Sequence, residues 1–584
     1  PSLLPSLGVK GQWARLVRPF DILARIELSV SLVSAMWRLP VVATLAGALV
    51  SAKPDADHCT AIVVGGKASA SGAPMVGQTD DSEGGPGTSL IYVPAQDHAP
   101  GSMRPILDQT TRNVIDYIPQ VAHTYAYTYM AYGVMNEHKV AIGESTCSAR
   151  ITASSRAHGG TALFSNEQMT MVALERCKTA RCTVEMMGDL AQNHGGFYGE
   201  DSGVDTGGEA LLVADSTEAW VFHVLADPSG KSAIWAAQRV PDDHIAAVPN
   251  IFVIRDMNLS SSDYILSSNA HDVASKYGWW KGQDRTTFNF AAAFSLGEYA
   301  NPFYSARRMW RIYDLVAPSL KLSPFPEITD TNAGYPFSVK PDNLLKPSDI
   351  FRIYRDYLEG TAFSLVADNP AAGPFNSPLR VASGAAEAQV PTGAWERPIS
   401  IYRADYALIN ECHPDGNGIV WVAPHTAHAS VFAPVWSSGA ADVARPYHIN
   451  TKIPVDRASL WWAASAVSNW AFGTMFSKAI VDIREQQAKV EPKCEAVAES
   501  LRKSSESPSK QSEALAKLAN EVHGEWWDLF WNLMGKYSDG YVVNRDPKTG
   551  SFTPEQPGYP AWWLSTVDFA HGVACPAESF QNLH

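Results

Sequence analysis

The segment of residues 59–84, CTAIVVGGKASASGAPMVGQTDDSEG, restricts the fold of this chain more than any other part of it. Cys59 is followed by an apolar β-branched run, a glycine-rich turn, and a second apolar run that ends in two carboxylates. Such runs, bounded by glycines, are typical of strands joined by a tight turn. The segment therefore predicts two strands, with the thiol of Cys59 at the first position of the first one.

Short β-runs and one helical segment continue this pattern up to about Phe252. Several runs alternate apolar and polar residues, as half-buried strands do, and Asn166–Asn193 carries its apolar residues on one helical face. A second β-rich block spans residues 397–450. Two β-rich blocks around helices favour a layered α+β architecture over βαβ repeats. Further helices are predicted at Tyr304–Ala317, at Lys346–Glu359 and over Ser459–Lys536 apart from the polar stretch Lys503–Gln511.

Composition and charge limit the class of protein. With 46% hydrophobic residues, the chain of 584 residues can bury a large core and is too apolar to be disordered. The net charge is −14, and the densest basic patch consists of Arg307, Arg308 and Arg311. Since a nucleic-acid binder presents a concentrated basic face, we expect no nucleic-acid partner.

The residues before Cys59 have the pattern of a secretory leader. Residues 36–52, MWRLPVVATLAGALVSA, combine a basic residue, an apolar run and small residues at the end, as a signal peptide cleaved after Ala52 does. One alternative is a buried helix. Another is a membrane anchor in which the apolar run continues into the preceding segment Leu28–Val33, but Arg38 and Pro40 interrupt the two segments. We expect residues 1–35 to be upstream sequence outside the native protein. We also expect a mature form that is secreted or lies in a lysosomal or vacuolar lumen, with no membrane attachment.

The cysteines and histidines show no metal-site spacing. Seven cysteines are present, and if Cys59 remains a thiol the other six can form up to three disulfides, whose pairs the sequence leaves open. Cys177 and Cys182 have neither zinc-knuckle spacing nor a common helix face. No HExxH pattern occurs, His425 and His428 lack a third ligand, and GGKAS lacks the first glycine of a phosphate loop. We therefore expect no metal and no cofactor.

Segment 59–84 resembles the start of the mature chain in the N-terminal-nucleophile (Ntn) cysteine dipeptidase family, whose relatives include the secernins. There a Cys-Thr pair opens a β-strand, a Gly-Lys-Lys-Ala-Ser-like turn follows, and the next strand leads to an aspartate. Because the matches keep the same order along the chain, they are far more specific than a Cys-Thr pair alone. They comprise GVMNEHKVAIGEST (133–146), EALLVADSTEAWVFHV (209–224), WAAQRVPDDHIAAVPN (235–250), RPISIYRADYALI (397–409), GIVWVAPHTAHASVFAPVW (418–436) and SLWWAASAVSNW (459–470).

This resemblance implies both a fold and an activation step. The implied fold is the four-layer αββα sandwich of Ntn hydrolases over residues 59–584, with added C-terminal helices from about residue 459. Residues 53–58 would be a propeptide, removed when Cys59 attacks the carbonyl of His58. The exposed α-amino group, with a pKa of about 7.7–8.0, would then take the proton of the thiol. Position alone would make Cys59 an unreactive, half-buried strand residue.

Four further residues match the site of the family. Asp81 would hold the α-amino group of the nucleophile, with Asp80 as the second choice. Asn136 would donate its amide to the developing oxyanion. Asn250 matches a second asparagine near the thiol, and Arg308 resembles an arginine that braces the site. Without the family match, the aspartate and asparagine positions would be interpreted as turn residues.

Gln78 is a departure from the family pattern, which often has an arginine there. The positive charge available to a substrate carboxylate is then lost or supplied elsewhere. This leaves the substrate preference open and does not affect the nucleophile.

The expected function is that of a cysteine dipeptidase, which hydrolyses small peptides through an acyl-enzyme on the autoprocessed Cys59. Two alternatives stay open. One is an Ntn amide hydrolase for N-acyl amides, with the same chemistry and a different pocket. The other is a non-catalytic secernin-like scaffold. The expected secretory leader argues against this alternative, because secernins resemble cytosolic proteins. The sequence also leaves open whether the chain forms a homo-oligomer.

Overall fold

The computed structural model describes residues 59–81, 88–199, 207–296, 302–325, 334–370, 372–379, 396–437, 443–450, 452–473 and 475–571. All of them belong to one compact unit, Ala56–His584. The upstream segment 1–35, the signal peptide 36–52 and the propeptide 53–58 that the sequence predicts lie outside the described residues.

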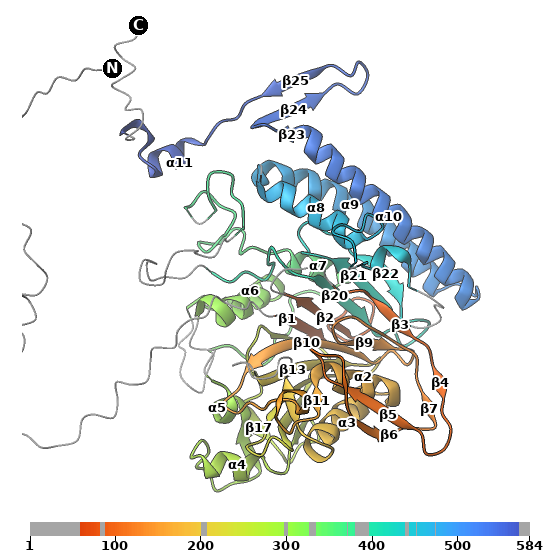
Figure 1. Cartoon of the computed structure of the whole chain (residues 1–584). Helices are drawn as coiled ribbons and strands as arrows, with labels where there is room; N and C mark the ends of the chain where they lie inside the picture. Colours follow the sequence, from red (N-terminus) through yellow and green to blue (C-terminus); the bar gives the residue numbers. More distant parts are fainter. Residues whose placement is uncertain are drawn as a thin grey trace, which may run out of the picture. The chain divides into compact units, whose positions relative to one another are not determined.

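Cys59 leads into the smaller of the two main sheets, a six-stranded antiparallel sheet (Figure 1). β1 is fully buried and lies between β16 and β2, as its uninterrupted β-branched run requires. The turn after β1 reverses the chain directly into β2, so Val64 pairs with Met75. In spatial order the strands are β16 (Ile245–Val248), β1 (Thr60–Val64), β2 (Met75–Asp80), β20 (Tyr406–Glu411), β21 (Ile419–Pro424) and β22 (Ala433–Trp436).

The larger sheet has eight strands and is also antiparallel. Its centre, β10, β13 and β14, is almost entirely buried. In spatial order the strands are β18 (Tyr264–Leu266), β15 (Ala233–Val240), β14 (Ala219–Ala226), β13 (Gly207–Ala214), β10 (Ala141–Ser148), β9 (Gly133–Asn136), β8 (Tyr127–Tyr129) and β3 (Ile91–Val93).

The two sheets pack face to face, with β1 and β2 against β10 and β13. A glycine permits the closest approach, because a Cβ on Gly143 would lie 2.7 Å from Cγ1 of Val76. Side chains that point between the sheets form the main hydrophobic core, which includes Val63, Val76, Leu212 and Ala246. The start of β1 therefore lies where residues of both sheets meet.

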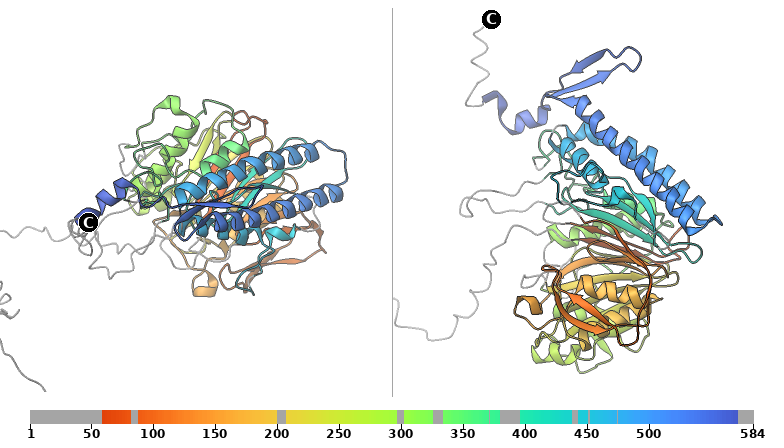
Figure 2. Two further views of the ribbon diagram at one scale, coloured as in Figure 1. Left: turned by 90° about the horizontal axis from the view of Figure 1, so that it is seen from above. Right: turned by 45° about the vertical axis from the view of Figure 1, so that its right-hand side comes forward.

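Helices cover both outer faces of the paired sheets (Figure 1). On the larger sheet lie α2 (Asn166–Arg176) and α3 (Ala180–Asn193); on the smaller one lie α6 (Arg307–Val316), α7 (Pro347–Tyr354), α8 (Leu460–Gly473), α9 (Phe476–Arg502) and α10 (Pro508–Lys536). Figure 2 shows the two long helices α9 and α10 side by side. The α+β class predicted from the sequence is confirmed. None of the described helices is long and apolar enough to cross a membrane.

The helix predicted over Asn166–Asn193 is two helices in the structure. The side chain of Thr179 accepts a hydrogen bond from the N–H of Cys182 and caps α3, and Asp215 accepts from the N–H of Ala180 at 2.8 Å. These contacts satisfy backbone N–H groups in the first turn of α3, as N-caps do. A disulfide, Cys177–Cys182, spans the break.

This disulfide is compatible with the expected upper limit of three. Cys412 and Cys494 are buried thiols, so fewer than three disulfides form. They lie after β20 and inside α9, respectively, in separate parts of the core. Cys575 lies outside the described residues.

Shorter elements complete the described chain. They are β4 (Gln96–Asp97), β5 (Met103–Leu107), β6 (Val114–Pro119), β7 (His123–Thr124), η1 (Arg156–His158), β11 (Phe164–Ser165), β12 (Phe197–Gly199), β17 (Asp256–Asn258), α4 (Ala270–Lys276), β19 (Thr287–Asn289), α5 (Phe290–Phe294), η3 (Pro302–Ala306), η4 (Pro318–Leu320), η6 (Arg445–Tyr447), β23 (Tyr537–Ser538), β24 (Tyr541–Arg545), β25 (Phe552–Glu555), α11 (Ala561–Thr566) and η7 (Phe569–His571).

Candidate active site

Cys59 stands directly before β1, as the sequence predicts, and its side chain is only 3% exposed. Its backbone carbonyl is held from two sides. Ser145 of β10 donates to it from Oγ at 3.3 Å, and Arg308 of α6 donates from Nη1 at 3.1 Å. The thiol-bearing residue is therefore fixed to both the opposite sheet and the covering helix.

Arg308 is fully buried and connects the start of β1 to the end of β16. Besides the Cys59 carbonyl, it donates to Oγ1 of Thr60 at 2.9 Å, to the carbonyl of Pro249 at 3.1 Å and to Oδ1 of Asn250 at 2.7 Å. A planar guanidinium suits such a set of fixed acceptors. The structure thus brings the sequence-predicted Arg308 to Cys59 and to Asn250.

Asn250 follows β16 in the left-handed region, with φ = 60°, which asparagine tolerates better than most residues. Its backbone N–H donates to Oγ of Ser145 at 3.0 Å, and its amide donates to the carbonyl of Thr146 at 2.7 Å. A second amide contact, to Oγ of Ser145, is long at 3.4 Å. One amide hydrogen is therefore weakly engaged, on the side of the network that contacts Cys59.

Asp81 is connected to the start of β1 through a threonine. The N–H of Thr60 donates to Oγ1 of Thr79 at 3.0 Å, and this hydroxyl donates to Oδ2 of Asp81 at 3.1 Å. The same carboxylate oxygen accepts from Nη2 of Arg397 at 2.6 Å. Asp80 contributes its carbonyl, which accepts from the N–H of Asp405. The structure therefore places Asp81 in the hydrogen-bonded chain that reaches residue 60.

Sequence reasoning missed Arg397. Its side chain is 4% exposed, and the Asp81 side chain that it pairs with is 0% exposed. The only signal was its position at the head of RPISIYRADYALI, one of the segments that resemble the family. A buried arginine cannot be told from a surface arginine in a single sequence.

Glu144 of β10, also missed, lies beside Cys59 and is fully buried. Its Oε1 accepts from Oγ1 of Thr146 at 2.9 Å. Burial raises the pKa of the Glu144 carboxyl, while its contacts with Glu209, Cys59 and Thr146 oppose this rise. A second carboxyl group and the thiol are thus immediate neighbours of Glu144.

Gln78 holds this cluster together. Its Oε1 accepts from the N–H of Glu144 at 2.7 Å, and its Nε2 donates to the hydroxyl of Tyr406 at 3.1 Å. Burial raises the pKa of Tyr406, and the charges of Asp80, Cys59 and Glu144 raise it further. Both the oxygen and the nitrogen of the Gln78 amide are therefore used in hydrogen bonds within the protein.

Tyr354 at the end of α7 also lies close to the site. Burial raises the pKa of its hydroxyl, with added effects from the charges of Asp81 and Cys59. A Cβ on Gly77 would lie 2.7 Å from this hydroxyl, so the ring can occupy this place only over a glycine. The hydroxyl has no hydrogen-bond partner within the described part of the chain.

The structure does not bring Asn136 to this site, which corrects the expectation of an oxyanion donor. Its Nδ2 donates to the carbonyls of Leu174 and Cys177 at 2.9 and 2.8 Å. Its Oδ1 accepts from the N–H groups of His138 and Val140. Both amide hydrogens are engaged in joining the β9–β10 turn to the end of α2, so none remains for a substrate.

Among the described residues, no group of three His, Cys, Asp or Glu side chains could hold a metal ion. His428 contacts the hydroxyl of Tyr357 at 2.6 Å, and the ring of His425 packs against Trp461. Burial lowers the pKa of His425 to about 3 and that of His428 well below its usual value. Both histidines are thus neutral core residues.

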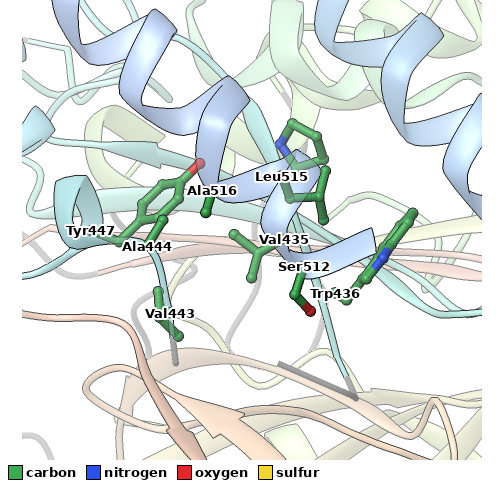
Figure 3. Close-up of a pocket in the computed structure, with 9 residues that line it drawn as sticks. Val435, Trp436, Val443, Ala444, Tyr447, Ser512, Leu515 and Ala516 are labelled. Carbon is green, nitrogen blue, oxygen red and sulfur yellow. The ribbon is translucent and has the colours of Figure 1, made fainter. Parts of the chain in front are cut away.

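Two pockets in the described structure lie away from Cys59. One, of about 20 Å³, lies between η6, β22 and α10 and is shown in Figure 3; a space of this size holds about one water molecule. The other, of about 300 Å³, is polar and lies between residues 152–161 and residues 227–230. Neither contains a residue of the Cys59 network.

Comparison with known proteins gives a consistent result. The sequence model of Peptidase family C69 matches residues 58–489. Among curated proteins, "Probable dipeptidase A" of Streptococcus pyogenes is 26% identical over 281 residues, which is 46% of this chain and 56% of that protein. "Probable dipeptidase B" of Lactococcus lactis is 25% identical over 224 residues, which is 36% of this chain and 43% of that protein. "Dipeptidase" of Bifidobacterium longum is 24% identical over 213 residues, which is 34% of this chain and 36% of that protein. The chain spans about half the length, or less, of these relatives.

Proposed function

The chain belongs to peptidase family C69, and from this we propose that it is a cysteine dipeptidase whose nucleophile is an autoprocessed, N-terminal Cys59. The observation that carries the proposal is the setting of Cys59. It heads a central strand, its carbonyl is held by Arg308 and Ser145, and its neighbour Thr60 is connected through Thr79 to a buried carboxylate. The two sheets, with helices on both outer faces, support the four-layer αββα arrangement as the fold behind this site.

Activation removes the residues before Cys59. The thiol attacks the carbonyl carbon of His58, the bond from that carbon to the Cys59 nitrogen breaks, and the nitrogen takes the thiol proton. Water then hydrolyses the thioester and releases the leader. The new α-amino group serves as the base for the thiol, because an N-terminal amine has a pKa of about 7.7–8.0. We assign Asp81 to hold this amine, because its carboxylate is connected through Thr79 to the N–H of the adjoining residue, Thr60.

Peptide hydrolysis uses the same groups. The thiolate of Cys59 adds to the scissile carbonyl, and the weakly engaged amide hydrogen of Asn250 donates to the oxyanion. The intermediate collapses as the α-ammonium of Cys59 gives its proton to the departing amine. Water, deprotonated by the α-amine, then attacks the thioester and releases the acid. Arg308 positions Asn250 and the start of β1.

The expected secretory leader and the Cys177–Cys182 disulfide support a secreted or lumenal location, because disulfides persist in oxidising compartments. Expression with residues 36–584 in a secretory host, followed by intact-mass and N-terminal analysis, tests both the leader and the processing. Recovery of the mature protein in the medium with Cys59 at its amino terminus is the expected result. Retention inside the cell would overturn this location.

The activity is tested on a panel of dipeptides, tripeptides and N-acyl amino acids, with and without a chelator and with a thiol alkylator. We expect turnover of dipeptides that a chelator leaves unchanged and an alkylator abolishes. Cys494→Ala, which removes a buried thiol of α9, is the matched control and should keep its activity. A preference for N-acyl substrates would favour the amide hydrolase, and no turnover of any of them would favour the scaffold.

A further inference from the structure

Glu144 of β10 and Glu209 of β13 place two carboxyl groups in the interior, beside the nucleophile. Both side chains are 0% exposed. In the register of the two strands, Thr146 lies opposite Glu209. Glu144, two residues before Thr146, is therefore the diagonal neighbour of Glu209 on the same face of the sheet, within reach of a long side chain. The two carboxyl groups contact each other, and Glu144 also contacts Cys59.

The position of Glu144 is fixed by its surroundings. Gln78 accepts a hydrogen bond from its N–H at 2.7 Å, and Thr146 donates to its Oε1 at 2.9 Å. The neighbouring residue, Ser145, donates to the carbonyl of Cys59. The other carboxylate oxygen, Oε2, receives no hydrogen bond from the part of the chain that the structure describes. Oε2 is therefore a buried acceptor near the thiol that can still receive a hydrogen bond.

Two adjacent buried carboxyl groups are costly when both are charged, because burial and like charge each disfavour ionisation. Burial accordingly raises the pKa of Glu144. A ligand that brings a positive charge and N–H donors would relieve this cost, since charge-assisted hydrogen bonds are the strong ones. A primary ammonium has both properties and satisfies two carboxyl groups at once.

The geometry of a dipeptide matches this arrangement. The α-ammonium nitrogen is two bonds away from the carbonyl carbon that the thiolate of Cys59 attacks. A carboxyl group in contact with Cys59 therefore lies where that ammonium arrives when the carbonyl meets the sulfur. An N-acylated substrate has an uncharged amide at the same place and would leave the carboxyl pair without a cation.

We propose that Glu144, supported by Glu209, binds the α-ammonium group of the substrate and so restricts the enzyme to peptides with an unblocked amino end. This assignment rests on the proposed dipeptidase function. In this assignment, Glu144 is the residue that makes the Cys59 site select dipeptides over N-acyl amides.

The wild-type enzyme provides the first test, with alanyl-alanine and propanoyl-alanine as substrates, which differ only by the amino group. We expect kcat/KM for propanoyl-alanine to be lower by about 10⁴-fold, as for sites built around a substrate N–H group. Propylamine should protect Cys59 from alkylation, whereas propanol should not. Equal turnover of the two substrates would overturn the inference while leaving the peptidase function intact. No turnover of any dipeptide would instead remove the proposed function itself.

The second test uses Glu144→Gln, with Glu209→Gln and Glu144→Asp beside it. In Glu144→Gln, kcat/KM for alanyl-alanine should fall about 10- to 150-fold, the range for one charged hydrogen bond. The value for propanoyl-alanine should stay within about twofold, and Glu144→Asp should recover part of the loss. An equal fall for both substrates would show that Glu144 acts on the thiol and would overturn the inference. If Glu144→Gln does not fold by circular dichroism, Glu209→Gln and the propylamine protection decide the question.

Discussion

Arg397 and Asp81 form a buried ion pair, in which Nη2 of the arginine lies 2.6 Å from Oδ2 of the aspartate. The two residues are 316 positions apart in the sequence; Arg397 lies in the segment that leads to β20, and Asp81 directly follows β2. The same Oδ2 accepts a hydrogen bond from Thr79, which in turn caps the N–H of Thr60. The pair therefore fixes the end of β2 and, through it, the start of β1 at Cys59.

Arg397→Met should destabilise the protein by about 3–5 kcal/mol, because Asp81 is left as a buried charge without its partner. Urea unfolding measures this change, and the fraction of chains that begin at Cys59 measures processing. The double variant Arg397→Met/Asp81→Asn should recover part of the stability but not the processing. As a matched control, Arg285→Met removes an exposed ion pair with Asp272 and should leave the urea midpoint nearly unchanged. Similar midpoints for Arg397→Met and Arg285→Met would contradict this view of the buried pair.

Arg308→Met should abolish processing, because it removes the donors to Cys59, Thr60, Pro249 and Asn250 together. The loss of several buried hydrogen bonds should also lower the stability by about 3 kcal/mol or more. Intact-mass analysis of the soluble protein gives the first result and urea unfolding the second.

The control for Arg308 lies one turn further along α6. Arg311 is also buried and pairs with Asp356 at 2.7 Å, so Arg311→Met should lose a comparable amount of stability. The folded fraction should still be processed at Cys59, because the hydrogen bonds of Arg311 go to Asp314, Asp356 and Glu359, away from the site. Equal processing by the two variants would mean that Arg308 only supports the fold.

Cys59→Ala should yield a chain that keeps residue 58 and whose turnover is lower by on the order of 10⁶-fold, the loss typical of removing a nucleophile. Cys59→Ser should be processed slowly, because a hydroxyl can attack but starts from a far higher pKa. N-terminal sequencing over a time course measures both. Cys412→Ala, which removes another buried thiol, should be processed like the wild type. An active enzyme that retains residues 53–58 would refute the mechanism.

The stability of the protein should fall on acidification because of buried neutral histidines. Burial lowers the pKa of His425 to about 3 from 6.5, so the folded state binds fewer protons than the unfolded state between these values. The stabilisation is complete above pH 6.5 and is lost towards pH 3 at about 1.4 kcal/mol per pH unit for this residue.

His425→Asn tests this dependence, since asparagine tolerates the φ of 66° found at this position. Urea unfolding between pH 4.5 and 7.5 should show a slope that is smaller by about 1.4 kcal/mol per pH unit than in the wild type. The control, His571→Asn, changes a residue that is 75% exposed in its side chain and should keep the wild-type slope. An unchanged slope in His425→Asn would show that this histidine is not neutral in the folded protein.

Short sequence patterns were sufficient to predict those strands and helices that are determined by neighbouring residues in the chain. The β-branched run after Cys59 and the glycine turn correctly predicted β1 and β2, and the periodic segments near the end predicted α8 to α10. The single helix expected over Asn166–Asn193 was wrong, because Thr179 caps a new helix within the segment and Asp215, which a distant hairpin brings to the N-terminus of α3, adds a second cap. The cap from Thr179 is a local signal, whereas the cap from Asp215 leaves none in a short window of sequence.

The candidate site divides in the same way. The sequence by itself determined the α+β class and the place of Cys59 at the head of β1, because a thiol before a β-run and the order of the family-like segments are properties of the chain alone. Only the tertiary structure decided which polar groups meet there. It excluded Asn136, whose amide is used by the end of α2, and it brought Arg397 to Asp81 and Glu144 to Cys59. These partners are far apart in sequence. The pairing of β2 with β20 brings the chain around Arg397 towards Asp81, and the facing of the two sheets brings Glu144 to Cys59.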